Sequence, residues 1–461
     1  MLGSSSYSSE EDHPDHNHPS PSDMSRHPPR CITTTYQCQQ LISSTSSSSI
    51  LAAPPRQLLI SCAELISRFE FSSANCLLSL LSSHLASPSG DSTERLVFYF
   101  CKALDHRVKN SYLSSCRSIG FNPSNGSSIG TPLASSFLFS QPSVHVQVAS
   151  SARVGYLTYL ALNQVTPFIR FAHLTANQAI LEAIEGYKAV HILDMDIMHG
   201  VQWPPLLQAI AERSATLGHP APTIRITGGG RDLELLNRTG DRIRKFAQSL
   251  GLKFQFHHLI MVDSNLTEAV EAINALELHL HFQEEEEVLA LHCGDFLHRL
   301  LREYDTTFLR RFLHKVKILN PRVFTVGERE ADHNHPLFLR RFIEAIDHYG
   351  AVFDSLEATL PPLSQERVAV EERWFGEEIK DVIGQEGEPR RQRHQKYESW
   401  EAVMRSSGFK SLPLSPFSVS QAKLLLRLHY PSEGYQLQVF HSNCLLLGWK
   451  NRPLFSVSSW Q

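Results

Sequence analysis

The stretch from Val190 to Pro205 constrains the fold of this chain more than any other segment. Its first five residues form an apolar run that ends in the carboxylate of Asp194, which is typical of a buried strand in a parallel sheet. A loop with a single glycine, Gly200, follows, and Pro204 then stands where the first turn of a helix favours proline. In an open α/β sheet, the crevice beyond such a strand end is the usual place for a ligand or a partner. The segment therefore predicts a sheet whose functional edge lies just after Asp194.

The pattern on either side of this stretch predicts a doubly wound sheet. Short apolar segments alternate with helical patterns and are joined by brief connections with Gly and Pro. We therefore expect an α/β fold with a Rossmann-like, mostly parallel sheet core, arranged as in methyltransferases, and a helical cap subdomain. The expected parallel strands span 189–194, 223–227, 252–257, 288–293 and 322–326.

Local signals predict further boundaries. Thr175 to Gln178 has the form of a capping box, so a helix is expected to begin at Thr175. The C-terminal region predicts three more strands, at 424–429, 436–440 and 444–449. The last two are close enough in sequence to pair as an antiparallel hairpin at the edge of the sheet.

Composition divides the chain into a tail and one ordered domain. Residues 1–53 are rich in Ser, His, Pro and Thr without periodicity, which predicts a disordered tail. The ordered domain is expected over 54–461, with a largely helical cap at 54–175 and the α/β core at 176–461. A helical excursion from the core to the cap near 266–316 is one arrangement that the pattern allows.

The expected sheet edge lacks the residues that bind nucleotide cofactors. A phosphate- or adenosyl-binding loop needs glycines directly after the first strand, but Met195 to His199 precede the single Gly200. The carboxylate that would hold ribose hydroxyls after the second strand is replaced by Gly228 to Gly230. We therefore expect no cofactor and no enzymatic activity, and keep an S-adenosylmethionine-dependent methyltransferase as the alternative.

Other site patterns are equally weak. The sequence has no G-x-S-x-G or H-E-x-x-H motif, and its eight cysteines form no Cys-x-x-Cys pair. Asp332 to His335 could be read as metal ligands, but histidines alternating with polar residues before Pro336 are more simply an exposed loop, so no metal site is expected. The net charge of −4 gives no global basic excess for nucleic acid, and no apolar run reaches the ~18 residues of a membrane span. These features predict a cytosolic or nuclear protein without membrane contact.

Many ordered motifs resemble those of the plant GRAS family over residues 56–461. The segment 372–387, the basic segment at 390–393 and two C-terminal motifs that end in Trp449 and Trp460 follow the family's order. The Ser-rich start and the segment 291–295 look most like the lateral suppressor branch. The signature and structural residues are Val190, His191, Ile192, Leu193, Asp194, Asp196, Gln202, Trp203, Pro204, Trp449 and Trp460.

Roles for these residues can be stated as hypotheses. Val190, Ile192 and Leu193 are expected in the strand core, and Trp203 and Trp449 are expected to be buried anchors. Asp194 and Asp196 are expected to accept hydrogen bonds that hold the following loop. The chain departs from the family pattern at Leu193, Met195, Arg391, Gln392 and Ser459, and none of these changes threatens the fold.

The resemblance implies a nuclear transcription regulator that acts mainly through contacts with other transcription factors. It also implies a role in the development of shoots and axillary meristems, with zinc-finger proteins or other GRAS proteins among the candidate partners and with homodimers or heterodimers allowed. Leucine-rich regions, matched here by 58–108 and 233–303, are the family's contact surfaces, although most leucines in such helices simply fill the core of the cap. Candidate contact residues in the first region are Leu77, Leu78, Leu80 and Leu81.

Direct, sequence-specific DNA binding is the alternative mode of action. The densest basic stretch could contact phosphates, serve nuclear import, or form a solvated loop that pairs with Glu386 and Glu388. The sequence leaves these three interpretations open. The residues concerned are Arg390, Arg391, Arg393 and Lys396.

Overall fold

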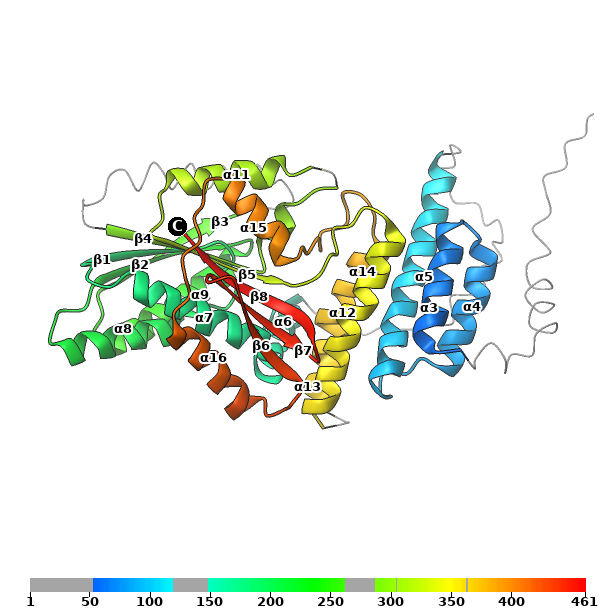
Figure 1. Ribbon diagram of the computed structural model, residues 1–461, viewed down its shortest axis with the longest axis horizontal. Helices are drawn as coiled ribbons and strands as arrows, with labels where there is room; N and C mark the ends of the chain where they lie inside the picture. The colour runs from blue at the N-terminus through cyan, green and yellow to red at the C-terminus, as the bar shows by residue number, and fades with distance from the viewer. Residues whose placement is uncertain (1–52, 119–147, 262–286, 304, 362–363) are drawn as a thin grey trace, which may run out of the picture. The chain divides into compact units, whose positions relative to one another are not determined.

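A computed structural model describes residues 53–118, 148–261, 287–303, 305–361 and 364–461 (Figure 1). Apart from Ala53, the tail predicted at 1–53 lies outside these described residues. Within the described part of the chain, no helix is both long and apolar enough to cross a membrane.

The first helices form the expected helical part. They are α3 (Pro55–Ser67), α4 (Phe71–His84) and α5 (Ser92–Ser118). Their apolar faces share one hydrophobic cluster with helices from much later in the chain, α12 (Phe338–Thr359) and α14 (Gly376–Gly384). Figure 1 shows α5 beside α12 and α14, so the core of the cap is built from both halves of the sequence.

The helix before the first strand begins earlier than predicted. Helix α6 (Val148–Val165) is followed at once by α7 (Pro167–Ala183), which has proline in its first turn. Thr175 is therefore inside α7, where its side chain is buried and its hydroxyl does not act as a cap. The capping-box prediction was wrong because the buried apolar face of the helix begins at Phe168, about two turns before Thr175. The expected boundary between 175 and 176 falls within this helix.

The sheet has eight strands in the order β3-β2-β1-β4-β5-β8-β7-β6. The first five strands are parallel, as predicted, and the last three are antiparallel to their neighbours. The sheet is thus mostly parallel with an antiparallel edge, and the predicted fold class is confirmed. The strands are β1 (Ala189–Asp194), β2 (Thr223–Gly230), β3 (Phe254–Ile260), β4 (Glu287–Gly294), β5 (Val323–Arg329), β6 (Tyr435–Phe440), β7 (Cys444–Trp449) and β8 (Arg452–Trp460).

Helices cover both faces of the sheet. Helices α7, α8 (Trp203–Leu217) and α9 (Leu233–Ser249) share one apolar cluster with β1 and β2. On the other face, α11 (Thr307–Ile318) and α15 (Tyr397–Ser406) share a second cluster with β4, β5 and β8. The short element η1 (Leu297–Leu300) follows β4, and α13 (Gln365–Val370) and the π-helical turn η2 (Glu371–Phe375) link α12 to α14.

Two predictions about the C-terminal region need correction. Residues 424–429 belong to the helix α16 (Pro416–His429), which starts with a proline after Ser415, whose hydroxyl accepts a hydrogen bond from the Ser418 N–H at 3.2 Å. These capping signals precede a leucine-rich run that sequence patterning alone assigned to a strand. The strand that joins the parallel and antiparallel parts is β8, which was not predicted. The predicted hairpin of β6 and β7 is confirmed.

The segment at 266–316 is described only in part. Residues 262–286 lie outside the described residues. The remainder forms β4, η1 and most of α11, whose apolar side chains pack on the sheet. The described portion of this segment therefore belongs to the core rather than to the cap.

Candidate functional site

The carboxyl edge of the sheet is organised around Asp194, the last residue of β1. Its side chain is buried and accepts hydrogen bonds from the Trp203 indole N–H at 3.0 Å and from the Asp196 backbone N–H at 3.2 Å. Trp203 opens α8, so one carboxylate links the end of the strand to the start of the following helix. Asp196, in the loop between them, pairs with Arg299.

Neighbouring signature residues complete this connection. Gln202 is buried, its backbone oxygen accepts from the Asn177 side chain of α7 at 2.8 Å, and Pro204 occupies the first turn of α8. His191 in β1 contacts Thr227 of β2 at 2.8 Å between its Nε2 and the threonine Oγ1. Val190, Ile192 and Leu193 are buried in the strand core, as expected.

The loop after β1 folds back over the end of β2. The Met195 N–H donates to the His292 carbonyl at 3.1 Å, and the Ile197 N–H donates to the Gly229 carbonyl at 2.9 Å. A Cβ atom at Gly229 would lie 2.4 Å from the Met195 carbonyl oxygen, and one at Gly228 would lie 2.9 Å from the Ile197 side chain. The triple glycine therefore admits the chain's own loop at the position where related folds hold a ribose.

A small cavity remains at this edge, with a volume of about 70 Å³. Ligand pockets for nucleotide-sized molecules are typically ~300 Å³ or larger, whereas a water needs roughly 10–15 Å³ on this measure. The cavity therefore has room for a few waters. Its polar lining includes Asp194, Asp196, Arg299 and Arg329, and its apolar lining includes Trp374.

Burial controls the charges at this edge. Burial and the nearby Asp196 raise the pKa of Asp194 to about 7, against the lowering effect of its two hydrogen bonds. Burial lowers the pKa of His191 and of His292 to about 3 each, so both rings are neutral at physiological pH. Among the charged groups at this edge, Asp196 pairs with Arg299, and Arg329 pairs with Glu378.

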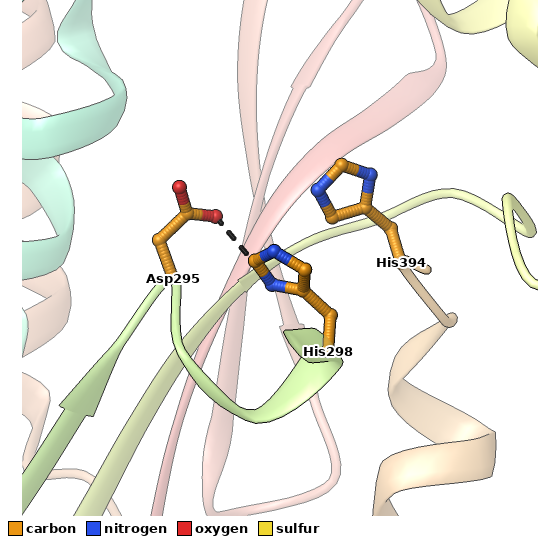
Figure 2. A group of neighbouring side chains, drawn as sticks. All are labelled: Asp295, His298 and His394. Atoms are coloured by element: carbon orange, nitrogen blue, oxygen red, sulfur yellow. Dashed lines mark ion pairs between the residues drawn. The ribbon is translucent and has the colours of Figure 1, made fainter. Parts of the chain in front are cut away.

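One further group could hold a metal ion among the described residues. Asp295, His298 and His394 each offer a ligand atom, and these atoms lie within 4.8 Å of one another (Figure 2). The Nδ1 of His298 contacts Glu328 at 2.8 Å, and both histidines leave Nε2 without a partner. However, burial lowers the pKa of His394, and the nearby Arg329 guanidinium lowers it further. The same guanidinium would repel a metal cation. We assign this cluster a structural role.

Glu328 is an important residue that the sequence analysis missed. One of its carboxylate oxygens accepts from the backbone N–H groups of Phe296, Leu297 and His298 at 2.7–3.3 Å, and the other contacts the His298 ring. It therefore fixes the turn η1 against β5. Its position near the carboxyl end of a buried strand was the only sequence signal.

The basic segment is mostly buried rather than exposed. Arg390 donates to the His333 carbonyl at 2.7 Å and pairs with Glu303, and Arg393 donates to the Gly387 carbonyl at 2.7 Å. Both arginine side chains are inaccessible to solvent, so neither can contact phosphates in this conformation. Of the four candidate residues, only Arg391 and Lys396 are exposed.

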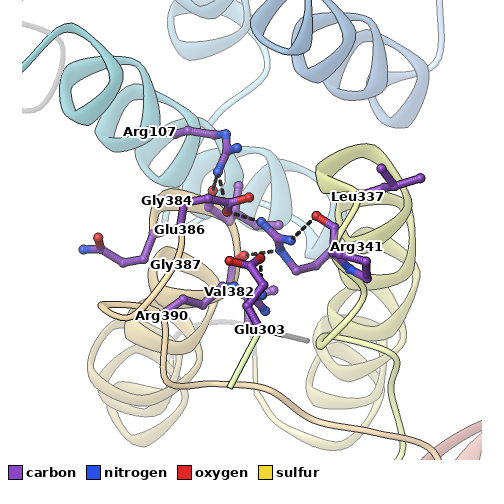
Figure 3. A network of polar contacts seen from close by, with 12 residues as sticks. Arg107, Glu303, Leu337, Arg341, Val382, Gly384, Glu386, Gly387 and Arg390 are labelled. Carbon is purple, nitrogen blue, oxygen red and sulfur yellow. Dashed lines mark hydrogen bonds and ion pairs between the residues drawn. The ribbon is translucent and has the colours of Figure 1, made fainter. Parts of the chain in front are cut away.

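Glu386, one of the two acids predicted to pair with the basic segment, forms its ion pairs with other arginines. Glu386 pairs with Arg341 of α12 and with Arg107 of α5 (Figure 3). Arg341 is fully buried and also donates to the Val382 carbonyl at 3.0 Å. These contacts join α5, α12 and the segment after α14, which makes the basic region part of the cap-to-core connection.

The candidate leucines of α4 differ in accessibility. Leu78 and Leu81 are buried in the cap core, whereas Leu77 and Leu80 are half-buried. That these leucines contact a partner protein remains a prediction. Only Leu77 and Leu80 are accessible enough to do so directly. The predicted anchors Trp203 and Trp449 are buried, and the Trp449 indole N–H donates to Asp354 at 2.7 Å. Trp460 is buried as well.

Comparison with known proteins agrees with this arrangement. A model of the GRAS domain family matches residues 55–461. Scarecrow-like protein 18 from Arabidopsis thaliana is 48% identical over 419 residues, covering 88% of this chain and 91% of that protein. Protein MONOCULM 1 from Oryza sativa subsp. japonica is 42% identical over 430 residues, covering 88% of each chain. The crystal structure of SCL7 in Oryza sativa is similar with a TM-score of 0.69 and 33% identity, covering 89% of this chain and 100% of that chain. These relatives agree with the lateral suppressor-like branch, and the chain belongs to the GRAS domain family.

Proposed function

We propose that this protein is a nuclear transcription regulator that acts mainly through contacts with other transcription factors during shoot and axillary meristem development. Proteins of the GRAS domain family regulate plant development. The name of the relative MONOCULM 1 refers to a single stem, which supports the shoot as the place of action. Zinc-finger proteins, other GRAS proteins or a second copy of this chain are the candidate partners.

The filled edge of the sheet is the observation that carries the proposal. The loop from Met195 to Ile197 lies against Gly228 and Gly229, where a cofactor would need space. The remaining volume of about 70 Å³ is far below that of a nucleotide pocket. This geometry supports a role through outer surfaces rather than through catalysis.

The alternative of a methyltransferase can be tested directly. Isothermal calorimetry of the full chain with S-adenosylmethionine should show no saturable heat. The variant Ile197→Ala removes the side chain that lies over Gly228. It is the control for whether extra space at this edge is enough to permit binding. Saturable micromolar binding to the unmodified chain would overturn the proposal that this is not an enzyme.

Partner-mediated action is favoured over direct DNA binding by the burial of Arg390 and Arg393. A protein that neutralises several phosphates loses affinity steeply with salt. We expect the purified chain alone to give no sequence-specific mobility shift, and expect a shift when a partner transcription factor is present. A specific, salt-dependent shift by the chain alone would favour the direct mode.

The main test is affinity capture of the tagged full chain from shoot nuclei, with a fluorescent fusion to locate it. Transcription factors should be enriched over a tag-only control, and the fusion should accumulate in nuclei. Exclusion of the fusion from nuclei, or the absence of any enriched transcription factor, would contradict the proposed function.

A further inference from the structure

Helix α16 carries an apolar face that no described part of the chain covers. Ser418, Ala422 and Leu426 are buried on its inner side, where it packs against α7 and β6 (Figure 1). On the outer side, Phe417, Leu424 and Leu428 are exposed by 58%, 53% and 63%. Covering these three side chains would remove apolar surface from water, which favours association.

The spacing of these side chains matches a helix-packing seam. Phe417, Gln421, Leu424 and Leu428 follow one another at intervals of four, three and four residues, which places them along one stripe of the helix. At 1.5 Å per residue the stripe is roughly 16 Å long, or about three turns. Three of the fourteen large hydrophobic residues that are exposed in the described chain fall on this one helix, so the stripe is a concentrated patch rather than scattered exposure.

The charged side chains of α16 itself that flank the stripe have one sign. Lys423 and Arg427 follow its edge one turn apart, and α16 contains no acidic residue. Within the described residues, neither cation forms an ion pair. An apolar stripe with a positive edge complements an amphipathic helix whose own apolar stripe is edged by Asp or Glu.

We propose that the α16 surface docks an amphipathic helix of a partner protein with acidic flanks. The α16 surface comprises Phe417, Gln421, Leu424 and Leu428 with the flanking Lys423 and Arg427. This inference rests on the proposed function, because it assigns chemistry to one of the partner contacts. A second copy of this chain fits less well, because an antiparallel pair of α16 helices would bring the two cationic edges together.

Two synthetic helical peptides with the same leucine stripe test the proposal. One has Glu at the flanking positions and the other has Lys, and each is titrated against the full chain by fluorescence anisotropy at physiological salt. We expect the acidic peptide to bind at least tenfold more tightly than the basic peptide. The double substitution Lys423→Glu with Arg427→Glu should reverse this preference.

Variants of the stripe separate binding from folding. Leu424→Asp with Leu428→Asp should weaken acidic-peptide binding at least tenfold while the melting temperature is retained, because both side chains are exposed. Leu217→Asp is the matched control, since Leu217 is 56% exposed on α8 and lies outside the α16 surface. It should leave peptide binding unchanged.

Three results would overturn the inference. The first is equal affinity for both peptides, or no binding of either. The second is peptide binding that persists after the Leu424 and Leu428 substitutions. The third is a concentration-dependent dimer in light scattering that those substitutions abolish. The same variants are measured in a plant-cell reporter of nuclear entry and transcription. If the unmodified chain regulates the reporter while the peptide test is negative, the α16 inference fails and the proposed function stands. If the unmodified chain neither enters nuclei nor affects the reporter, the proposed function fails whatever the peptides show.

Discussion

Replacing Asp194 by Asn tests whether the acid at the end of β1 is a buried structural group. In the folded chain, burial and the charge of Asp196 raise the pKa of Asp194 to about 7. Asparagine has nearly the same shape and retains an oxygen that can accept from the Trp203 indole, but it cannot ionise. The substitution therefore removes the free-energy cost of ionisation while it keeps the main contact.

The size of the effect follows from linkage. An ordinary aspartate has a pKa of 3.8, so between about pH 4 and pH 7 the folded chain holds a proton that the unfolded chain has released. Stability therefore falls as the pH rises through this window, by about 4 kcal/mol in all at 1.36 kcal/mol per pKa unit. About 3 kcal/mol of that loss lies between pH 5 and pH 8.5. For roughly 400 folded residues, this corresponds to a change in Tm of about 3 °C.

The assay compares melting temperatures of the variant and the unmodified chain from pH 5 to pH 8.5. The Tm of Asp194→Asn minus that of the unmodified chain should rise by about 3 °C across this range. Asp354→Asn is the control, because Asp354 also accepts from an indole, that of Trp449. Burial would raise the pKa of Asp354, but hydrogen bonds from Lys450 and Trp449 hold it below its ordinary value.

The control has the opposite sign. A carboxyl with a lowered pKa contributes stability that is present above its unfolded pKa and is lost as the pH falls. The Tm of Asp354→Asn should therefore lie below that of the unmodified chain throughout the range, without the upward trend. A flat or falling difference for Asp194→Asn would refute the account of Asp194 as a buried acid.

Three further substitutions test other parts of the structure by thermal or denaturant unfolding. Gly229→Ala should destabilise the chain by about 1–3 kcal/mol, because its Cβ would lie 2.4 Å from the Met195 carbonyl oxygen; an unchanged Cm would mean that the loop does not lie on β2. Arg390→Met should lower stability by about 2–3 kcal/mol through lost hydrogen bonds, whereas Arg391→Met at the exposed neighbour should change it by less than about 1 kcal/mol; equal effects would contradict the assigned burial. Trp460→Ala should cost about 3 kcal/mol or more, because its ring is fully buried between the sheet and α15; a near-neutral result would place it at the surface.

The parallel part of the fold could be predicted from sequence because local signals agreed with the final packing. Strand β1 is mostly apolar and is buried on both faces, so its composition reflects its environment. Pro204 and Gly218 mark the first turn and the C-terminal cap of α8, where Gly218 has a φ of 64°. These signals depend only on neighbouring residues and therefore survive without knowledge of the tertiary structure.

The sequence-based predictions failed or stayed open where contacts between distant parts of the chain determine the local structure. The leucine run in α16 fits a strand or a helix equally well by apolar content, and its packing against α7 favours the helix. Strand β8 has alternating small residues that offer little periodic signal, yet it pairs with both β5 and β7. The sequence left the burial of Arg390 undecided because its acceptor, the His333 carbonyl, and its ion-pair partner, Glu303, lie tens of residues away in sequence.

The polar groups at the sheet edge also explain why the cavity there is a poor docking place. Asp194 is satisfied by Trp203, and Asp196 is neutralised by Arg299. Moving the loop aside to admit a ligand would break these contacts and leave buried polar groups unsatisfied, at about 1–3 kcal/mol for each. The exposed side chains of α16 carry no such penalty, since covering them removes apolar surface from water and disrupts no internal bond. This balance of free energies supports the proposal that the protein recognises other molecules at its outer helices, while the contacts at the edge of its sheet stabilise the fold.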